Sequence, residues 1–156
     1  MTSVVARARL KAPPVSALWT RRPRLFGLLE GPPLVALIAG PGYDKTHLLA
    51  AWVAEQSLEP AWYSVAEGDD EPYLLVAHLC AALGVDPGES TGRAALDRAL
   101  NALVGRPTVL IVDDVHRLVN PEALRLLNYV LDYLPEGSRA VLAGRERPRM
   151  AGWSTW

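Results

Sequence analysis

The chain has 156 residues and a mass of 17.0 kDa, which is the length of a single domain. Half of its residues are hydrophobic and 21% are charged, so it can bury a core and is not expected to be disordered. The formal net charge of −1 excludes a globally basic nucleic-acid binder, and the single cysteine, Cys80, excludes a disulfide framework or a multi-cysteine metal site.

The charge is divided unevenly along the chain. Residues 1–24 contain six basic side chains and no acidic one, so this arm carries +6 and leaves −7 for the remainder. Such an arm can contact nucleic acid or phosphate, but we expect a solvated, partly flexible lead-in. It is also Arg-rich like a transit peptide, yet its prolines disrupt an amphipathic helix. The sequence has neither a secretory signal nor an apolar run of membrane-spanning length, so we expect a cytoplasmic protein.

After the arm, apolar runs alternate with helical patterns. A short helical turn is predicted around residues 24–30, and strands are predicted at 34–39, 61–65, 108–112 and 139–143. Helices are predicted at 45–57 and 73–83, after a cap at Ser90 or Thr91, and after the cap pair Asn120-Pro121. This alternation predicts an α/β fold, a parallel sheet with helices on both faces and a ligand at the carboxyl ends of the strands. The first strand should lie beside the fourth, and the third between the fourth and the second.

The first predicted strand leads into a helix through a turn that resembles a phosphate-binding loop. Its sequence is Ala39-Gly-Pro-Gly-Tyr-Asp-Lys-Thr46, and Lys45 and Thr46 match the end of the consensus G-x-x-x-x-G-K-[ST]. Ala39 and Asp44 stand where the consensus has glycine. Asp44 adds a side chain and a negative charge where the backbone must approach phosphates, so we expect it to weaken nucleotide binding. A tight turn without a ligand is the alternative interpretation.

The third predicted strand ends in two acids, Asp113 and Asp114. Such a pair can hold Mg²⁺ and orient an attacking water, and by itself it also fits an ordinary turn or helix cap. The order, with a Lys-Thr turn after one strand and paired acids after a later one, favours phosphate chemistry.

Six segments in order resemble the N-terminal part of the ATP-binding module of large LuxR-type bacterial transcriptional regulators, a branch of the STAND class of P-loop ATPases. They are Arg22–Leu25, Gly40–Leu49, Ala61–Val65, Glu67–Pro72, Leu110–His116 and Ala143–Arg145. The resemblance covers roughly residues 10–148. It implies a three-layer P-loop NTPase fold that binds ATP or ADP with Mg²⁺, in which the nucleotide acts as a conformational switch.

The resemblance also implies roles at the matched positions. Lys45 would contact the β and γ phosphates, Thr46 and Asp113 would bind Mg²⁺, Asp114 would poise the hydrolytic water, and Arg145 would sense the γ-phosphate. The other implied nucleotide-binding positions are Gly40, Pro41, Gly42, Tyr43, Asp44 and His47, with Arg22 or Arg24 near the base or ribose. Alanine is usual in that family at the position of Ala39, whereas the family keeps glycine where this chain has Asp44.

The resemblance divides the chain into a basic arm (1–24), an ATPase-like domain (25–148) and an irregular tail (149–156). Family members continue into a fifth strand, a helical lid and further modules, whereas this chain stops at Trp156, so we expect a truncated or frame-disrupted relative. Without the fifth strand, residues 34–39 would form an exposed apolar sheet edge that promotes self-association.

Three functions stay open at this point. The first is a nucleotide-binding signalling module that hydrolyses ATP slowly at most. The second is a pseudo-ATPase or remnant that acts only as an interaction domain, and the third is a small-molecule kinase, although an arginine-rich lid is not evident. Direct DNA binding by this fragment is not expected, because no helix-turn-helix pattern with a basic second helix is visible.

The remaining polar and aromatic residues have ordinary interpretations. His47, His78 and His116 lie too far apart in sequence to indicate a metal site, and His78 is expected on a helix face. Cys80, Trp52 and Trp62 are expected in the core. The acidic cluster at 67–71 is expected to be a solvated loop.

Overall fold

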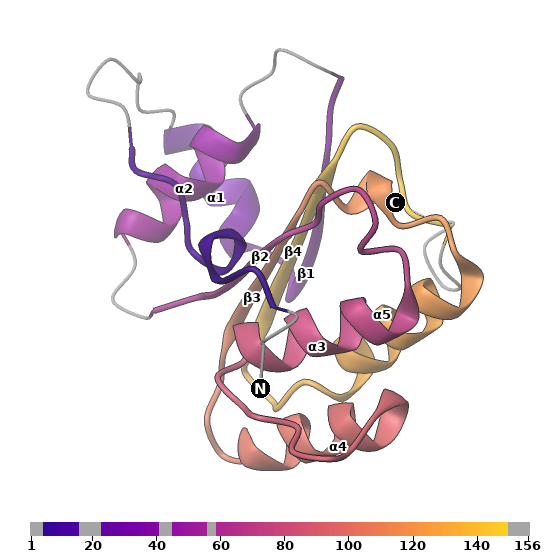
Figure 1. Cartoon of the computed structure of the whole chain (residues 1–156). Coiled ribbons are helices and arrows are strands. Elements are labelled where there is room, and N and C mark those ends of the chain that lie inside the picture. Colours follow the sequence, from indigo (N-terminus) through magenta and orange to yellow (C-terminus); the bar gives the residue numbers. More distant parts are fainter. Residues whose placement is uncertain (1–4, 16–22, 41–44, 56–58, 150–156) are drawn as a thin grey trace.

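The computed structural model describes residues 5–15, 23–40, 45–55 and 59–149. Their strands are β1 (Leu34–Ile38), β2 (Ala61–Ser64), β3 (Val109–Asp113) and β4 (Arg139–Gly144). They form one parallel sheet in the order β1-β4-β3-β2 (Figure 1). The α/β class, the parallel sheet and the order of its strands are therefore confirmed, and each strand bound lies within one residue of the prediction.

Five α-helices and two short 3₁₀ helices accompany the sheet in the described residues. They are α1 (Pro23–Glu30), α2 (Lys45–Glu55), α3 (Pro72–Ala82), α4 (Gly92–Ala102), α5 (Pro121–Tyr133), η1 (Arg7–Leu10) and η2 (Val115–Arg117). The Asn120 side chain caps α5 as predicted, because its oxygen accepts the N–H of Glu122 over 3.0 Å. Thr91 is at the capping position of α4, but its hydroxyl makes no capping bond. The predicted end of the helix at 45–57 lies outside the described residues.

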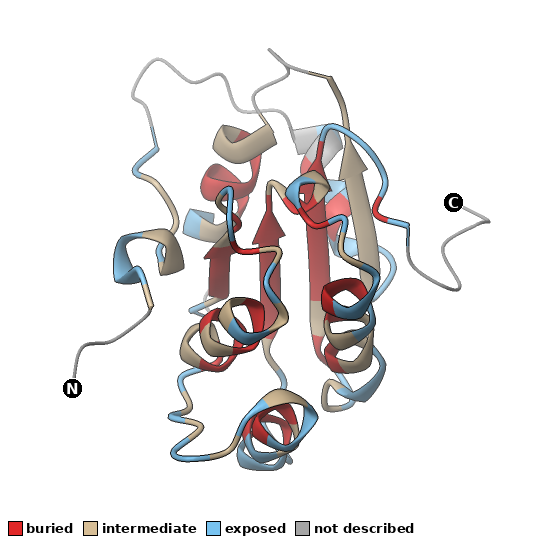
Figure 2. Ribbon diagram, turned by 45° about the vertical axis from the view of Figure 1, so that its right-hand side comes forward, coloured by how far each residue is buried: buried red, intermediate tan, exposed pale blue. Residues whose placement is uncertain are grey.

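Alternate residues of the strands face two different helical layers. Ile111 and Val141 pack with α1 and α2, whereas Leu110 and Leu142 pack with α3, α4 and α5. Figure 1 shows these two groups of helices on opposite faces of the sheet, and Figure 2 shows the buried strands between them. Burying a leucine or isoleucine side chain contributes about 1.5–3 kcal/mol, so the continuous apolar runs favour this three-layer arrangement.

The core contains the residues expected in it. Trp52 and Trp62 are each 1% exposed, and the Cys80 side chain is fully buried. Burial raises the pKa of the Cys80 thiol to about 11, so this thiol stays protonated near neutral pH. These three predictions are confirmed.

The two edges of the sheet have different surroundings. η1 lies against β2 and α3 at one edge, whereas β1 forms the other edge and is half-buried along its whole length. The described part of the arm is also attached to the core, because Leu10 and Ala12 pack against it. Residues 5–15 are exposed or half-buried, so they are solvated as expected, although some of them also pack on the core. In the part of the chain that the structure describes, no helix is long and apolar enough to cross a membrane.

Candidate functional site

The end of β1 and the start of α2 place the side-chain amine of Lys45 at the carboxyl ends of the strands. Lys45 Nζ donates to the carbonyl oxygens of Ala39 at 2.6 Å and Gly40 at 3.2 Å. These carbonyls belong to the residues that directly follow β1. The ammonium is therefore held at the entrance of the loop that joins β1 to α2, where it can exchange a carbonyl partner for an anionic one.

The first turn of α2 is joined to the end of β3. Thr46 Oγ1 donates a hydrogen bond of 2.6 Å to Oδ2 of Asp113, which is 2% exposed. The other carboxylate oxygen, Oδ1, accepts the N–H of Asp114 over 2.9 Å. A hydroxyl and a carboxylate thus lie together beside a helix N-terminus, and both are the hard oxygen ligands that Mg²⁺ prefers.

The environment of Asp113 disfavours its charge in the absence of a cation. Burial raises the pKa of the Asp113 carboxyl above its ordinary value, and the neighbouring charge of Asp114 acts in the same direction. The hydrogen bonds from Thr46 and the Asp114 N–H, with the charge of Lys45, offset only part of this rise. A bound cation would remove this imbalance, so the donor set fits a metal ion chemically.

Asp114 has a left-handed backbone conformation, with φ of 58° and ψ of 35°. Among the described residues it is the sole non-glycine with positive φ. Aspartate tolerates this region better than most residues, at a cost of about 1–2 kcal/mol. The conformation ends β3 at Asp113 and starts η2.

Arg145 follows β4 at the same edge of the sheet. Its backbone N–H donates to His116 Nδ1 over 3.1 Å, and its residue is exposed. The preceding residue, Gly144, is in register with Ile38, and its carbonyl accepts the Ala39 N–H over 3.1 Å. The end of β4 is therefore attached both to the exit of β1 and to η2.

The structure describes only some of the residues that the sequence assigned to a nucleotide site. Lys45, Thr46, Asp113, Asp114 and Arg145 all follow strand ends at one edge of the sheet or open the adjoining helix. Gly40 leaves β1 and His47 lies half-buried in the first turn of α2, while Arg24 is exposed on α1. Arg22, Pro41, Gly42, Tyr43 and Asp44 lie outside the described residues.

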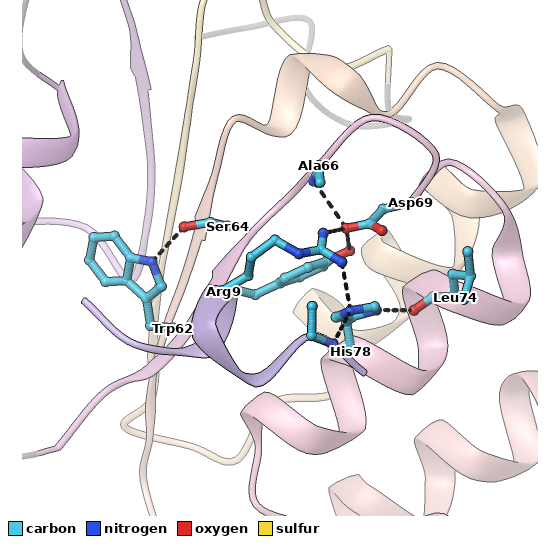
Figure 3. Close-up of polar contacts among 9 residues, drawn as sticks. Arg9, Trp62, Ser64, Ala66, Asp69, Leu74 and His78 are labelled. Carbon is cyan, nitrogen blue, oxygen red and sulfur yellow. Dashed lines mark hydrogen bonds and ion pairs between the residues drawn. The ribbon is translucent and has the colours of Figure 1, made fainter. Parts of the chain in front are cut away.

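A second polar cluster joins the arm to β2, the outer strand on the side of the sheet away from β1, and was missed by sequence reasoning (Figure 3). Arg9 forms an ion pair with Asp69, whose carboxylate also accepts from Tyr63 Oη at 2.9 Å and from the Ala66 N–H at 3.0 Å. His78 accepts the Ala6 N–H at its Nε2 over 3.2 Å and contacts the Leu74 carbonyl through Nδ1.

This cluster corrects the expectation for the acidic segment and bears out the one for His78. Asp69 is 3% exposed, so the acidic segment 67–71 is not uniformly solvated. His78 does lie on a helix, α3, but it is 1% exposed and stacks on the Tyr63 ring at 5.3 Å between centroids. Burial acts to raise the pKa of Asp69, yet the hydrogen bonds from Ala66, Arg9 and Tyr63 outweigh it and hold the pKa below its ordinary value. No local pattern indicated this, since Arg9 and Asp69 are 60 residues apart.

Asp70, next to this cluster, fixes the segment that follows η2. Its Oδ1 accepts the backbone N–H groups of Val119 at 2.9 Å and Asn120 at 2.8 Å. The loop after β2 is therefore bonded to the segment that leads from the paired acids into α5. Asp70 thus holds backbone groups of the segment before α5. Among the described residues, no group of three or more His, Cys, Asp or Glu is arranged so that it could hold a metal ion.

A large cavity in the described part of the chain is lined by none of the residues that end the strands. It has a volume of about 1070 Å³ and is bordered by residues of the arm, of α3 and the start of α4, of the segment between these helices, and of α5. Its lining mixes opposite charges such as Arg93 and Glu122 with apolar residues such as Val76. We place the candidate site at the strand ends instead, because the lysine, the hydroxyl and the paired acids meet there.

Comparison with known proteins agrees with this geometry. The family model of the AAA domain matches residues 29–147. The chain is also 30% identical over 148 residues to the HTH-type transcriptional regulator MalT of Cronobacter sakazakii, in an alignment that covers 83% of this chain and 16% of MalT. It thus spans about a sixth of the length of that relative. The chain belongs to the AAA domain family and is a P-loop ATPase module.

Proposed function

We propose that this module binds ATP or ADP with Mg²⁺ at the carboxyl edge of the sheet, and that the nucleotide acts as a conformational switch. The 2.6 Å contact between Thr46 Oγ1 and Asp113 Oδ2 carries the proposal, because it places two oxygen donors for Mg²⁺ beside the lysine amine. The N-terminus of α2 adds a favourable position for phosphate. Bound Mg²⁺ would supply neutralisation of the charge on the outer phosphates.

Each residue at this edge has a separate task in the proposal. Lys45 exchanges the carbonyls of Ala39 and Gly40 for phosphate oxygens, while Thr46 and Asp113 hold the metal ion. Asp114, which directly follows β3, orients the water for slow hydrolysis. Arg145 at the end of β4 distinguishes ATP from ADP through the γ-phosphate. The loop positions 40–44 and His47 surround the phosphates, and Arg22 approaches the base or ribose.

The kind of protein to which the module belongs is part of the same proposal. The relative that matches most of this chain is named as a transcriptional regulator. This supports a module of the STAND class within a cytoplasmic LuxR-type regulator, where nucleotide state changes the conformation of the module. The chain of 156 residues is not itself proposed to bind DNA.

Asp44 favours one competing function, a pseudo-ATPase that serves only as an interaction domain. Two like charges about 4 Å apart repel by about 1 kcal/mol in bulk water and by several times more in a drier site. Asp44 precedes Lys45 directly, so its carboxylate would lie near the phosphates that the lysine attracts. The two functions differ in whether nucleotide binds at all.

Calorimetric titration of the full chain with ATP and ADP, with and without Mg²⁺, tests the proposal. We expect weak binding that Mg²⁺ strengthens for ATP. Lys45→Ala should abolish it, and Thr46→Val should remove only the Mg²⁺ dependence because it lacks the hydroxyl. Thr46→Ser keeps the hydroxyl and should retain that dependence. Binding that is the same in Lys45→Ala and in the unaltered chain would contradict the proposal.

We further propose that two copies of the chain associate through β1. Ala39 N–H and Pro33 C=O bond to β4, and backbone groups alternate along a strand, so the N–H of Ala36 faces the free edge. Ala36→Pro removes that outward donor and leaves the bonds to β4 in place. Sedimentation should show concentration-dependent dimers of the unaltered chain and fewer of Ala36→Pro. A chain that stays monomeric at all concentrations would contradict this part.

A further inference from the structure

His116 lies where the segment after the paired acids meets the end of β4. It belongs to η2, which begins directly after Asp114, and its Nδ1 accepts the backbone N–H of Arg145 over 3.1 Å. A ring nitrogen that accepts a hydrogen bond carries no proton, so the proton of the neutral ring is on Nε2. The contact joins two elements that the site needs, although the residues are 29 positions apart.

The packing around Gly144 shows that η2 rests directly on the end of β4. A Cβ placed on Gly144 would lie 3.0 Å from the His116 backbone nitrogen and 3.1 Å from both His116 Nδ1 and Val115 Cγ1. No side chain fits between the strand and η2 at that distance. The position of η2 is therefore fixed relative to β4 by close contact as well as by the hydrogen bond.

The peptide unit between Gly144 and Arg145 is held at both of its polar ends. Its carbonyl oxygen accepts the N–H of Ala39 at the exit of β1, and its N–H donates to His116. Because the peptide is planar, these two bonds together set the orientation of the plane and hence the direction in which the chain continues at Arg145. The one side chain among these bonding groups is the imidazole of His116.

We propose that His116 is a positioning residue that sets the direction of Arg145 and ties it to the paired acids. The inference rests on the proposed function, in which Arg145 faces the γ-phosphate. A displacement of η2 that follows a change at Asp113 or Asp114 reaches the end of β4 through the close contact at Gly144, and it reaches the Arg145 N–H through the hydrogen bond to His116. Discrimination between ATP and ADP then depends on His116, although its side chain need not touch the nucleotide.

Two substitutions of His116 distinguish the effect of its hydrogen-bond acceptor from the effect of the size of its ring. His116→Asn places an amide oxygen at the same number of bonds from Cα as Nδ1 and keeps an acceptor for the Arg145 N–H. His116→Leu fills a similar volume and has no acceptor. Arg145→Ala removes the side chain whose direction is in question and leaves the backbone bond intact.

The first readout needs no nucleotide. In ¹⁵N-labelled full chain, the Arg145 amide should lose its downfield shift and exchange at least about fivefold faster in His116→Leu, the fold-change that loss of one net hydrogen bond supports. His116→Asn should keep both properties close to those of the unaltered chain. The amide of Val141, in the middle of β4, reports on general loosening of the strand and should not change. An Arg145 amide that is unaffected in His116→Leu would overturn the inference.

The second readout is the ratio of the ATP and ADP dissociation constants, measured in the unaltered chain and in an Asp44→Gly background. His116→Leu and Arg145→Ala should each reduce the preference for ATP by about fivefold, and the double variant should lose no more than either alone. His116→Asn should restore the preference, which a merely structural role for ring bulk does not predict. The inference would be overturned if the losses of ATP preference in His116→Leu and Arg145→Ala were additive in the double variant. It would also be overturned if His116→Asn lost as much of the preference as His116→Leu. If no protein in the series binds nucleotide, the proposed function fails, while the amide readout still decides whether His116 positions Arg145.

Discussion

Thr46 Oγ1 donates a hydrogen bond to Asp113 Oδ2 over 2.6 Å, and the two residues are 67 positions apart in the chain. The contact depends on the parallel sheet, which brings the exits of β1 and β3 to the same edge although β4 lies between them. It also leaves a carboxylate almost fully buried with a hydroxyl as its side-chain partner. Such a pair is poorly arranged for stability and well arranged for a cation.

We predict that Asp113→Asn makes the folded protein more stable at pH 7. The pKa of Asp113 lies above its ordinary value of 3.8 in the native state, so that state holds the proton more tightly than the unfolded chain. The free energy of unfolding therefore falls as pH rises from about 3.8 through the raised native pKa of Asp113, and it stays reduced at higher pH. Urea unfolding at pH 7 should give a higher free energy of unfolding for Asp113→Asn, and the gain should disappear near pH 3. A variant that is less stable at pH 7 would contradict the burial argument.

Asp69 gives the free energy of unfolding a dependence on pH that is opposite to the one expected for Asp113. Its native pKa is lowered below the ordinary value of 3.8, so it contributes stability that is present above that value and is lost as pH falls through the lowered pKa. Asp69→Asn should cost about 1–3 kcal/mol at pH 7, since a charged hydrogen-bond acceptor for Arg9 and Tyr63 is lost. The difference from the unaltered chain should narrow below pH 4.

The matched control for Asp69 is Glu67→Gln, which removes the same charge from an exposed position of the same loop. Urea unfolding should find it within about 0.5 kcal/mol of the unaltered chain at every pH. If both variants lose the same stability, the effect comes from net charge and not from the buried cluster.

The sheet could be predicted from the sequence because each strand is specified by the composition of its own short segment. The runs at 34–38 and 109–112 are apolar at every position, and a strand covered on both faces requires that composition. Lys45, Thr46 and the paired acids could be assigned to one edge because parallel strands all end at the same side.

The contacts that orient the site were not accessible in this way. The bonds from Arg9 to Asp69 and from Arg145 to His116 join segments that no periodicity relates, and each depends on tertiary packing. The left-handed turn at Asp114 was also missed, because an acid pair after a strand is compatible with several backbone conformations. The predicted roles of Arg22 and Asp44 stay predictions, since both residues lie outside the described part of the chain.

A pair of glycine substitutions tests the contact between β4 and η2. Gly144→Ala should destabilise the protein by about 1–3 kcal/mol, because the new Cβ meets the His116 backbone nitrogen at 3.0 Å. Gly27→Ala should instead stabilise it by up to about 1 kcal/mol, since Gly27 lies within α1 and its Cβ would meet nothing within 4 Å. Thermal unfolding of both variants provides the measurement. Equal effects of the two substitutions would show that η2 does not rest on β4.

In the proposed function, phosphate binds beside Lys45 and the carboxylate of Asp44 opposes this binding. Titration of four proteins with ATP at one Mg²⁺ concentration tests it most directly: the unaltered chain, Asp44→Gly, Asp44→Asn, and Asp44→Gly combined with Lys45→Ala. We predict the tightest binding for Asp44→Gly and an intermediate affinity for Asp44→Asn, which removes the charge but keeps the side chain. Adding Lys45→Ala should remove the gain. Tight binding by the unaltered chain, or no improvement in Asp44→Gly, would contradict the account.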